Sequence, residues 1–120
     1  MMKKLIFEYY AMSIAEQFNI SLEELFTQTK KSHIVDARQL LYWLCIERPI
    51  KKSYIQTYLK ENGYVVSHST LIYGYRKAQE LIKTDPDFKT MVTRIQKNYS
   101  NNSFIKETIK KKPGQTKLNF

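Results

Sequence analysis

Apolar residues recur along most of the chain at the spacing of one helical face. Ala11, Ile14, Ala15 and Phe18 stand three and four positions apart, which is the repeat of an amphipathic α-helix. Similar stripes occur further along the chain. Together with capping residues and helix breakers, they predict helices over about 3–18, 22–26, 34–47, 52–61, 68–83 and 86–98.

Capping residues and helix breakers set the expected ends of these helices. Ser21 and Glu24 have the spacing of a capping box, which opens the second, short helix. Pro49 stops the third helix, and Gly63 ends the fourth in a left-handed conformation. Ser67 is the expected N-cap of the fifth helix.

The chain has only three glycines and three prolines in 120 residues, too few for the many turns of an all-β protein. Its apolar fraction of 42% is enough for a packed core. We therefore expect an all-α protein, with a compact helical domain over 1–98 and a flexible basic tail over 99–120. The tail contains a polar linker at 100–103 and a lysine run at 110–112.

The net positive charge of the chain indicates what kind of partner it binds. Twenty lysines and arginines against eleven acidic residues give a net charge of +9 and a pI of about 9.6. Such an excess on a small protein favours a nucleic acid or an anionic membrane surface. No stretch approaches the roughly 18 apolar residues of a membrane span. Glu8 interrupts the apolar start, so we expect no signal peptide, no membrane partner and a cytoplasmic protein.

Residues that could support catalysis are sparse. Cys45 is the single cysteine, which excludes an internal disulfide or a cysteine-rich zinc site, and it is expected to be buried. The two histidines, His33 and His68, stand apart from any paired carboxylates, and no glycine-rich phosphate loop is present. We expect no metal, no cofactor and no enzymatic activity.

The most informative region is a short helix, a tight glycine-containing connection and a longer helix over 51–83, which is a helix-turn-helix pattern. A recognition helix presents its N-terminus to the DNA major groove, where hydrogen-bonding side chains read base edges. The residues in that position are Ser67, His68, Ser69 and Thr70, with Tyr73 one turn further along. The alternative is that these residues only form a capped helix start.

Three stretches of the chain resemble the C-terminal DNA-binding domain of the bacterial replication initiator DnaA, a helix-turn-helix domain similar to the Trp repressor. They are Ser13–Leu25, Ala37–Gln39 and His68–Thr70. Their order and spacing agree with that family over about 12–98. The resemblance implies sequence-specific binding to double-stranded DNA, with the recognition helix in the major groove and a basic loop in the adjacent minor groove.

The same resemblance suggests which lysines contact DNA. The family's basic loop corresponds to 29–32, so Lys30 or Lys31 is the implied minor-groove residue; an ordinary solvated loop is the alternative. Cations near the two helices of the motif are candidates for phosphate contacts: Lys51, Lys52, Arg76 and Lys77.

Several positions depart from the family pattern. Val66 stands where the family has arginine, Ser67 where it has aspartate, and Ser69 where it has the first threonine. Lysine replaces arginine in the basic loop, although arginine fits a narrow minor groove better. We therefore expect a target site that differs from the family's usual one. Without the ATP-binding motor domain, the chain is expected to mark, block or recruit rather than to melt an origin.

The end of the chain carries a second resemblance. Gln115, Leu118 and Phe120 match Gln-x-x-Leu-x-Phe, the short peptide with which bacterial proteins bind the replicative sliding clamp. The two apolar side chains would enter a pocket while Gln115 forms hydrogen bonds at its rim. A chance match in a frayed terminus is the alternative.

We thus expect a monomeric protein that binds double-stranded DNA in replication initiation or its regulation. Two alternatives remain at this point. A transcriptional regulator can use the same fold, since fold does not determine function. A protein-interaction module that recruits or inhibits a replication factor could retain the helix-turn-helix only as a scaffold.

Overall fold

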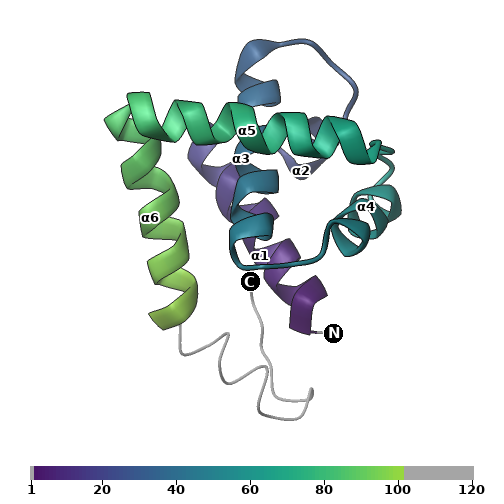
Figure 1. Cartoon of the computed structure of the whole chain (residues 1–120), viewed down its shortest axis with the longest axis horizontal. Helices are drawn as coiled ribbons and strands as arrows, with labels where there is room; N and C mark the ends of the chain where they lie inside the picture. Colours follow the sequence, from purple (N-terminus) through teal and green to yellow (C-terminus); the bar gives the residue numbers. More distant parts are fainter. Residues whose placement is uncertain (1, 102–120) are drawn as a thin grey trace.

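A computed structural model describes residues 2–101 of the chain, and these form six α-helices and no strand (Figure 1). The helices are α1 (Met2–Phe18), α2 (Leu22–Leu25), α3 (Ser32–Glu47), α4 (Lys52–Glu61), α5 (His68–Thr84) and α6 (Pro86–Asn101). The predicted all-α fold class is therefore confirmed. The lysine run and the predicted clamp peptide of Gln115, Leu118 and Phe120 lie outside the described residues.

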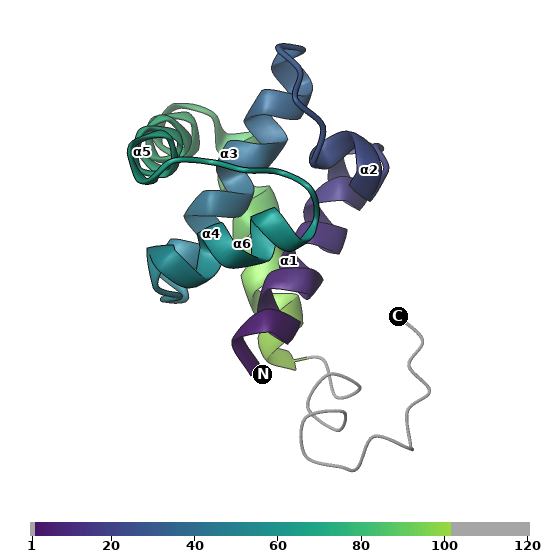
Figure 2. The ribbon, with the colours of Figure 1, turned by 90° about the vertical axis from the view of Figure 1, so that its right-hand side faces the viewer.

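Helix α3 is the centre of the fold. It packs against α1 on one side and against α5 on the other, so that it separates these two helices (Figure 2). Full burial of an aliphatic or aromatic side chain contributes about 1.5–3 kcal/mol, which makes this shared core the main source of stability. The side chains in it that are completely buried include Ile14, Leu40, Leu41, Leu44, Ile55, Leu59 and Leu71.

The expected helix signals act as predicted. Ser21 Oγ accepts the backbone N–H of Glu24 at 3.0 Å, and Glu24 Oε1 accepts the backbone N–H of Ser21 at 2.9 Å. This completes the capping box before α2. Gly63 follows α4 with φ of +85°, and Ser67 caps α5 by accepting the backbone N–H of Thr70 at 3.1 Å.

The last helix is longer than expected. It was predicted to end at residue 98, but α6 continues to Asn101. Tyr99 explains the extra turn, because its buried ring lies 5.3 Å from the ring of Tyr9 and 6.2 Å from that of Tyr10, measured between centroids. The helix therefore extends past residue 98 to place one more aromatic side chain in the core.

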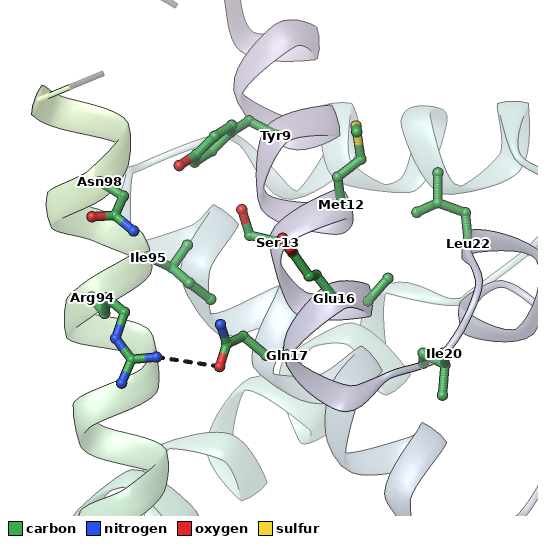
Figure 3. Close-up of a pocket in the computed structure, with 11 residues that line it drawn as sticks. Tyr9, Met12, Ser13, Glu16, Gln17, Ile20, Leu22, Arg94, Ile95 and Asn98 are labelled. Atoms are coloured by element: carbon green, nitrogen blue, oxygen red, sulfur yellow. Dashed lines mark hydrogen bonds between the residues drawn. The ribbon is translucent and has the colours of Figure 1, made fainter. Parts of the chain in front are cut away.

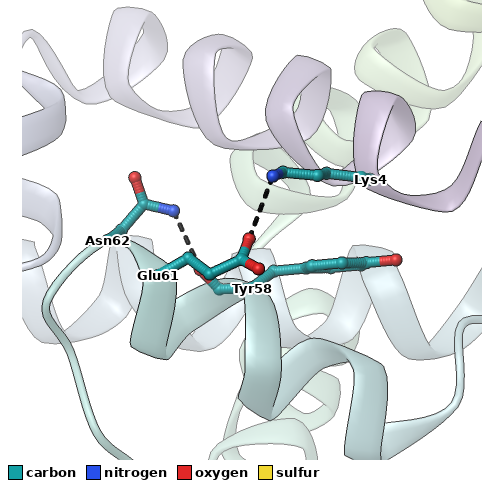
Figure 4. Close-up of polar contacts among 4 residues, drawn as sticks. All are labelled: Lys4, Tyr58, Glu61 and Asn62. Atoms are coloured by element: carbon teal, nitrogen blue, oxygen red, sulfur yellow. Dashed lines mark hydrogen bonds and ion pairs between the residues drawn. The ribbon is translucent and has the colours of Figure 1, made fainter. Parts of the chain in front are cut away.

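An ion pair links the start of α1 to the end of α4. Lys4 Nζ in α1 lies 3.1 Å from Glu61 Oε1 at the end of α4 (Figure 4). The hydrogen bond and charge of Glu61 raise the pKa of Lys4. Just beyond, Asn62 Nδ2 donates to the carbonyl of Tyr58 at 2.9 Å. Exposed ion pairs add little stability, so this contact chiefly orients the end of α4.

Candidate nucleic-acid interface

The connection between α4 and α5 has the bounds expected from sequence, but it is longer than the turn of a typical helix-turn-helix. It covers residues 62–67, whereas the turn of a helix-turn-helix has about three to four residues. Tyr64 and Val66 point into the core, and Gln56 Nε2 donates to the carbonyl of Val66 at 2.9 Å. Val65 between them is 71% exposed. The extra residues are thus packed against the domain and leave one apolar side chain on the surface.

The predicted base-reading residues all lie on the surface. Ser67, His68, Ser69 and Thr70 are exposed at the start of α5, and Tyr73 is 58% exposed one turn later. Ser67 is also committed to the helix cap, because its Oγ accepts the backbone N–H of Thr70 at 3.1 Å while its hydroxyl donates to Thr70 Oγ1 at 2.9 Å. The cap and the exposed surface therefore coexist, and His68, Ser69 and Tyr73 are the side chains best placed to meet a ligand.

Two of the predicted phosphate contacts lie next to this helix start. Lys51 and Lys52 stand at the start of α4 as its N-cap and first residue and, with His68 of α5, line a shallow hollow of about 500 Å³. Lys51 is the N-cap of α4 and makes no side-chain hydrogen bond to the helix. The first N–H groups of α4 consequently have no side-chain cap, and such groups favour anions.

The other two predicted phosphate contacts lie further along α5. Arg76 and Lys77 are both exposed, and Lys77 Nζ lies 6.0 Å from the centroid of the Tyr73 ring. Lys77 also faces the start of α3. Burial raises the pKa of Asp36 there, and the charges of His33 and Lys77 partly oppose that shift. The outer face of α5 therefore adjoins the end of α3 that follows the basic loop.

The basic loop between α2 and α3 presents its lysines to solvent. Lys30 and Lys31 are exposed, and the loop passes above the N-terminal half of α5, with α4 below it (Figure 1). Lys31 N–H donates to Thr29 Oγ1 at 3.2 Å. The predicted minor-groove residues and the start of the predicted recognition helix are thus both exposed, although Figure 2 shows α3 between the loop and α5.

Arg38 anchors this loop, a role that the sequence analysis missed. Its side chain is only 5% exposed, and its Nε donates to the carbonyl of Leu25 at 3.0 Å while Nη2 donates to that of Thr27 at 2.6 Å. The guanidinium carbon lies 4.4 Å from the centroid of the Tyr64 ring. The signal in the sequence was a charged residue directly after Ala37, within the segment whose apolar stripe predicts α3.

Gly74 allows α5 to approach α3 closely, and it too was missed. A Cβ atom at this position would lie 2.6 Å from Cδ2 and 2.8 Å from Cε2 of Tyr42. Further along α5, Tyr75 donates its hydroxyl hydrogen to Glu47 Oε2 at 2.5 Å, and this bond raises the pKa of Tyr75. The sequence signal was a glycine within a helical pattern, which often marks a close approach.

The described residues offer little for other kinds of site. Within 2–101, no helix combines the length and apolarity needed to cross a bilayer. Over the same range, no three His, Cys, Asp or Glu side chains gather as metal ligands would. Cys45 is fully buried, as expected, and burial raises the pKa of its thiol.

The chain is similar in sequence to several curated bacterial proteins. It is 29% identical over 96 residues to the chromosomal replication initiator protein DnaA of Flavobacterium psychrophilum, covering 78% of this chain and 19% of that protein. Identity to DnaA of Citrifermentans bemidjiense is 32% over 90 residues, or 75% and 19% of the two chains. The chain is a distant homologue of DnaA.

A third DnaA, from Pelobacter propionicus, is 30% identical over 93 residues, which cover 78% of this chain and 20% of that protein. The chain thus spans about a fifth of the length of these DnaA proteins. No family model matches it, and no solved structure does. The homology confirms the DnaA resemblance inferred from sequence and is consistent with a single helical DnaA domain.

Proposed function

We propose that this chain is a sequence-specific double-stranded DNA-binding protein that acts in replication initiation or its regulation. The carrying observation is the exposed start of α5, where His68 lines one hollow with Lys51 and Lys52 and the next residue, Ser69, is exposed. Homology to DnaA supports the link to replication. In this role the protein is non-enzymatic and works in the bacterial cytoplasm, where the chromosome lies.

In the proposed complex, α5 enters the major groove with its N-terminus first. That groove is about 12 Å wide and accepts an α-helix. His68 and Ser69 contact base edges, and Tyr73 reaches the next bases along the groove. Lys51, Lys52 and the uncapped N–H groups of α4 bind one phosphate strand.

The outer face of α5 and the basic loop complete the complex. Arg76 and Lys77 hold phosphates along the groove, and Lys30 or Lys31 inserts into the neighbouring minor groove. The position where the DnaA family has arginine is the buried Val66, so it offers no cation to the DNA. This supports a target site that differs from the usual DnaA site.

The test is selection from random DNA duplexes at fixed, near-physiological salt. The wild type should yield a reproducible motif, and the His68→Ala, Ser69→Ala variant should lose it. Gln79→Ala is the matched control, because Gln79 is exposed on the same helix but was not assigned to the interface. An unchanged motif in the double variant would exclude base reading by the start of α5.

The same experiment addresses the two alternative functions. A transcriptional regulator would yield a motif that occurs at promoters rather than at an origin. A protein-interaction module would yield no motif, and salt would abolish its weak duplex binding. Tethering to the sliding clamp through Gln115, Leu118 and Phe120 remains a separate prediction, tested by loss of clamp binding on Phe120→Ala.

A further inference from the structure

A groove of about 600 Å³ runs between α1 and α6 and ends at the start of α2 (Figure 3). Buried Ala15 and Ile95 lie at its base. It lies away from the predicted DNA-reading residues, because α3 separates α1 from α5 (Figure 2). A ligand in this groove would therefore leave the start of α5 accessible.

The walls of the groove carry exposed apolar surface. Met12 is 39% exposed and Leu22 is 41% exposed, and both line it. In the part of the chain that the structure describes, five large apolar side chains are exposed, and these are two of them. Two such side chains facing one hollow indicate a surface that binds apolar groups.

Opposite charges stand at the two sides of the same groove. Glu16 on α1 and Arg94 on α6 both line it (Figure 3). Arg94 Nη1 donates to Gln17 Oε1 at 3.3 Å, a long and exposed hydrogen bond. The guanidinium is therefore held at the groove, and no carboxylate of the described residues 2–101 lies within ion-pairing distance of it. A ligand with apolar residues, one acid and one base would match the groove in both respects.

We propose that this groove binds residues 103–109 of the same chain, Ser-Phe-Ile-Lys-Glu-Thr-Ile. The first argument is position along the chain. Asn98 lines the groove, and α6 ends one turn later at Asn101. Two residues span at most about 7 Å, so the segment starts beside the mouth of the groove and can return along it.

The second argument is composition. Phe104, Ile105 and Ile109 are the apolar residues of this segment. In the proposed complex they cover the exposed apolar side chains of Met12 and Leu22. Phe104 and Ile105 enter beside Met12, and Ile109 reaches Leu22. The segment also carries one acid and one base at adjacent positions.

Charge complementarity is the third argument. Glu107 of the segment pairs with Arg94, and Lys106 pairs with Glu16. The lysines at 110–112 then follow at the α2 end of the groove, where Glu23 is exposed. Docking consequently directs residues 110–120 away from α5, so that the lysine run and the clamp-like peptide do not compete for the DNA-reading face.

Disulfide trapping in the full chain tests the docking without reference to DNA. Ser13 lines the groove, so a Ser13→Cys, Lys106→Cys chain should form an intrachain disulfide under mild oxidation. The matched control is Ser69→Cys, Lys106→Cys, which places the first cysteine on exposed α5. Native Cys45 does not interfere, because it is fully buried.

The expected result is an intrachain disulfide that forms at least about tenfold faster in the groove pair than in the control, since docking raises the local thiol concentration above that of a free tether. Met12→Asp should remove this difference and Met12→Leu should retain it, with circular dichroism confirming that both variants fold. Equal rates for the two pairs would overturn the proposal. So would interchain disulfides whose yield rises with protein concentration, because the occupant would then be a second copy.

Discussion

Arg38 Nη2 donates to the backbone carbonyl of Thr27 at 2.6 Å, which ties the middle of the fold to the start of the basic loop. The same guanidinium donates through Nε to the Leu25 carbonyl and lies 4.4 Å from the centroid of the Tyr64 ring. Tyr64 belongs to the connection before α5. One buried side chain therefore positions both the loop that carries Lys30 and Lys31 and the segment that leads to the recognition helix.

Arg38→Ala should destabilise the domain by about 3 kcal/mol. Hydrogen bonds from a charged group contribute about 1.5–3 kcal/mol, and their loss leaves the carbonyls of Leu25 and Thr27 short of donors. Urea unfolding measures the change in the free energy of unfolding. Arg76→Ala is the control, because Arg76 is an exposed arginine on α5 and its loss should cost no more than about 0.5 kcal/mol of stability. Equal urea midpoints for the two variants would contradict the anchoring role.

Gly74→Ala should destabilise the domain by about 1–3 kcal/mol, although alanine is the better helix former by about 1 kcal/mol. The added methyl group would overlap the ring of Tyr42 at 2.6 Å and push α5 away from α3. Thermal unfolding and duplex affinity should both decrease. If the overlap is the cause, adding Gly74→Ala to a Tyr42→Ala background should cost less than adding it to the wild type. Equal costs would point to another cause.

These two residues show where sequence analysis reached its limit. The caps at Ser21 and Ser67 depend on neighbours within three positions, so local spacing was enough to predict them. Arg38 and Gly74 act on partners more than ten positions away along the chain, Thr27 and Tyr42. Their roles appear only when the helices are packed together, and no periodicity encodes that packing.

Some features of the candidate site follow from local sequence, and others depend on how the helices pack together. Exposure of His68 follows from its place at the start of an amphipathic helix, which the sequence predicts. The hollow that His68 shares with Lys51 and Lys52 depends on how the packed residues 62–67 bring α5 beside the start of α4. The buried ring of Tyr99 likewise extends α6 for a tertiary reason that local propensity does not contain.

Stability should fall as the pH rises from about 10 to 12. Burial raises the pKa of Tyr10 from 10.0 to about 12, with nearby Cys45, Tyr99 and Tyr9 adding to the rise and Arg48 opposing it. A tyrosine with a raised pKa stays neutral in the folded state while the unfolded chain ionises, so its contribution is complete below pH 10 and decreases above it. Urea midpoints at several pH values test this.

The control for this pH dependence is Tyr10→Phe, which keeps the ring and removes the ionisable hydroxyl. Its stability should decline less steeply between pH 10 and 12 than that of the wild type. Part of the decline should persist, because burial also raises the pKa values of Tyr42 and Cys45. Identical slopes for the variant and the wild type would mean that Tyr10 ionises alike in both states.

Lys51→Ala, Lys52→Ala should weaken duplex binding without changing which sequence is preferred. Each lost phosphate contact reduces the dependence of log affinity on log salt by about one, so the double variant should lose about two. The comparison is Lys89→Ala, Lys97→Ala, which removes two exposed cations from α6 and should leave the slope near the wild-type value. Binding titrations at four or more salt concentrations supply the slopes. A larger loss in the α6 variant would mean that DNA lies against α6 instead of the start of α4, and the proposed orientation of α5 would then be wrong.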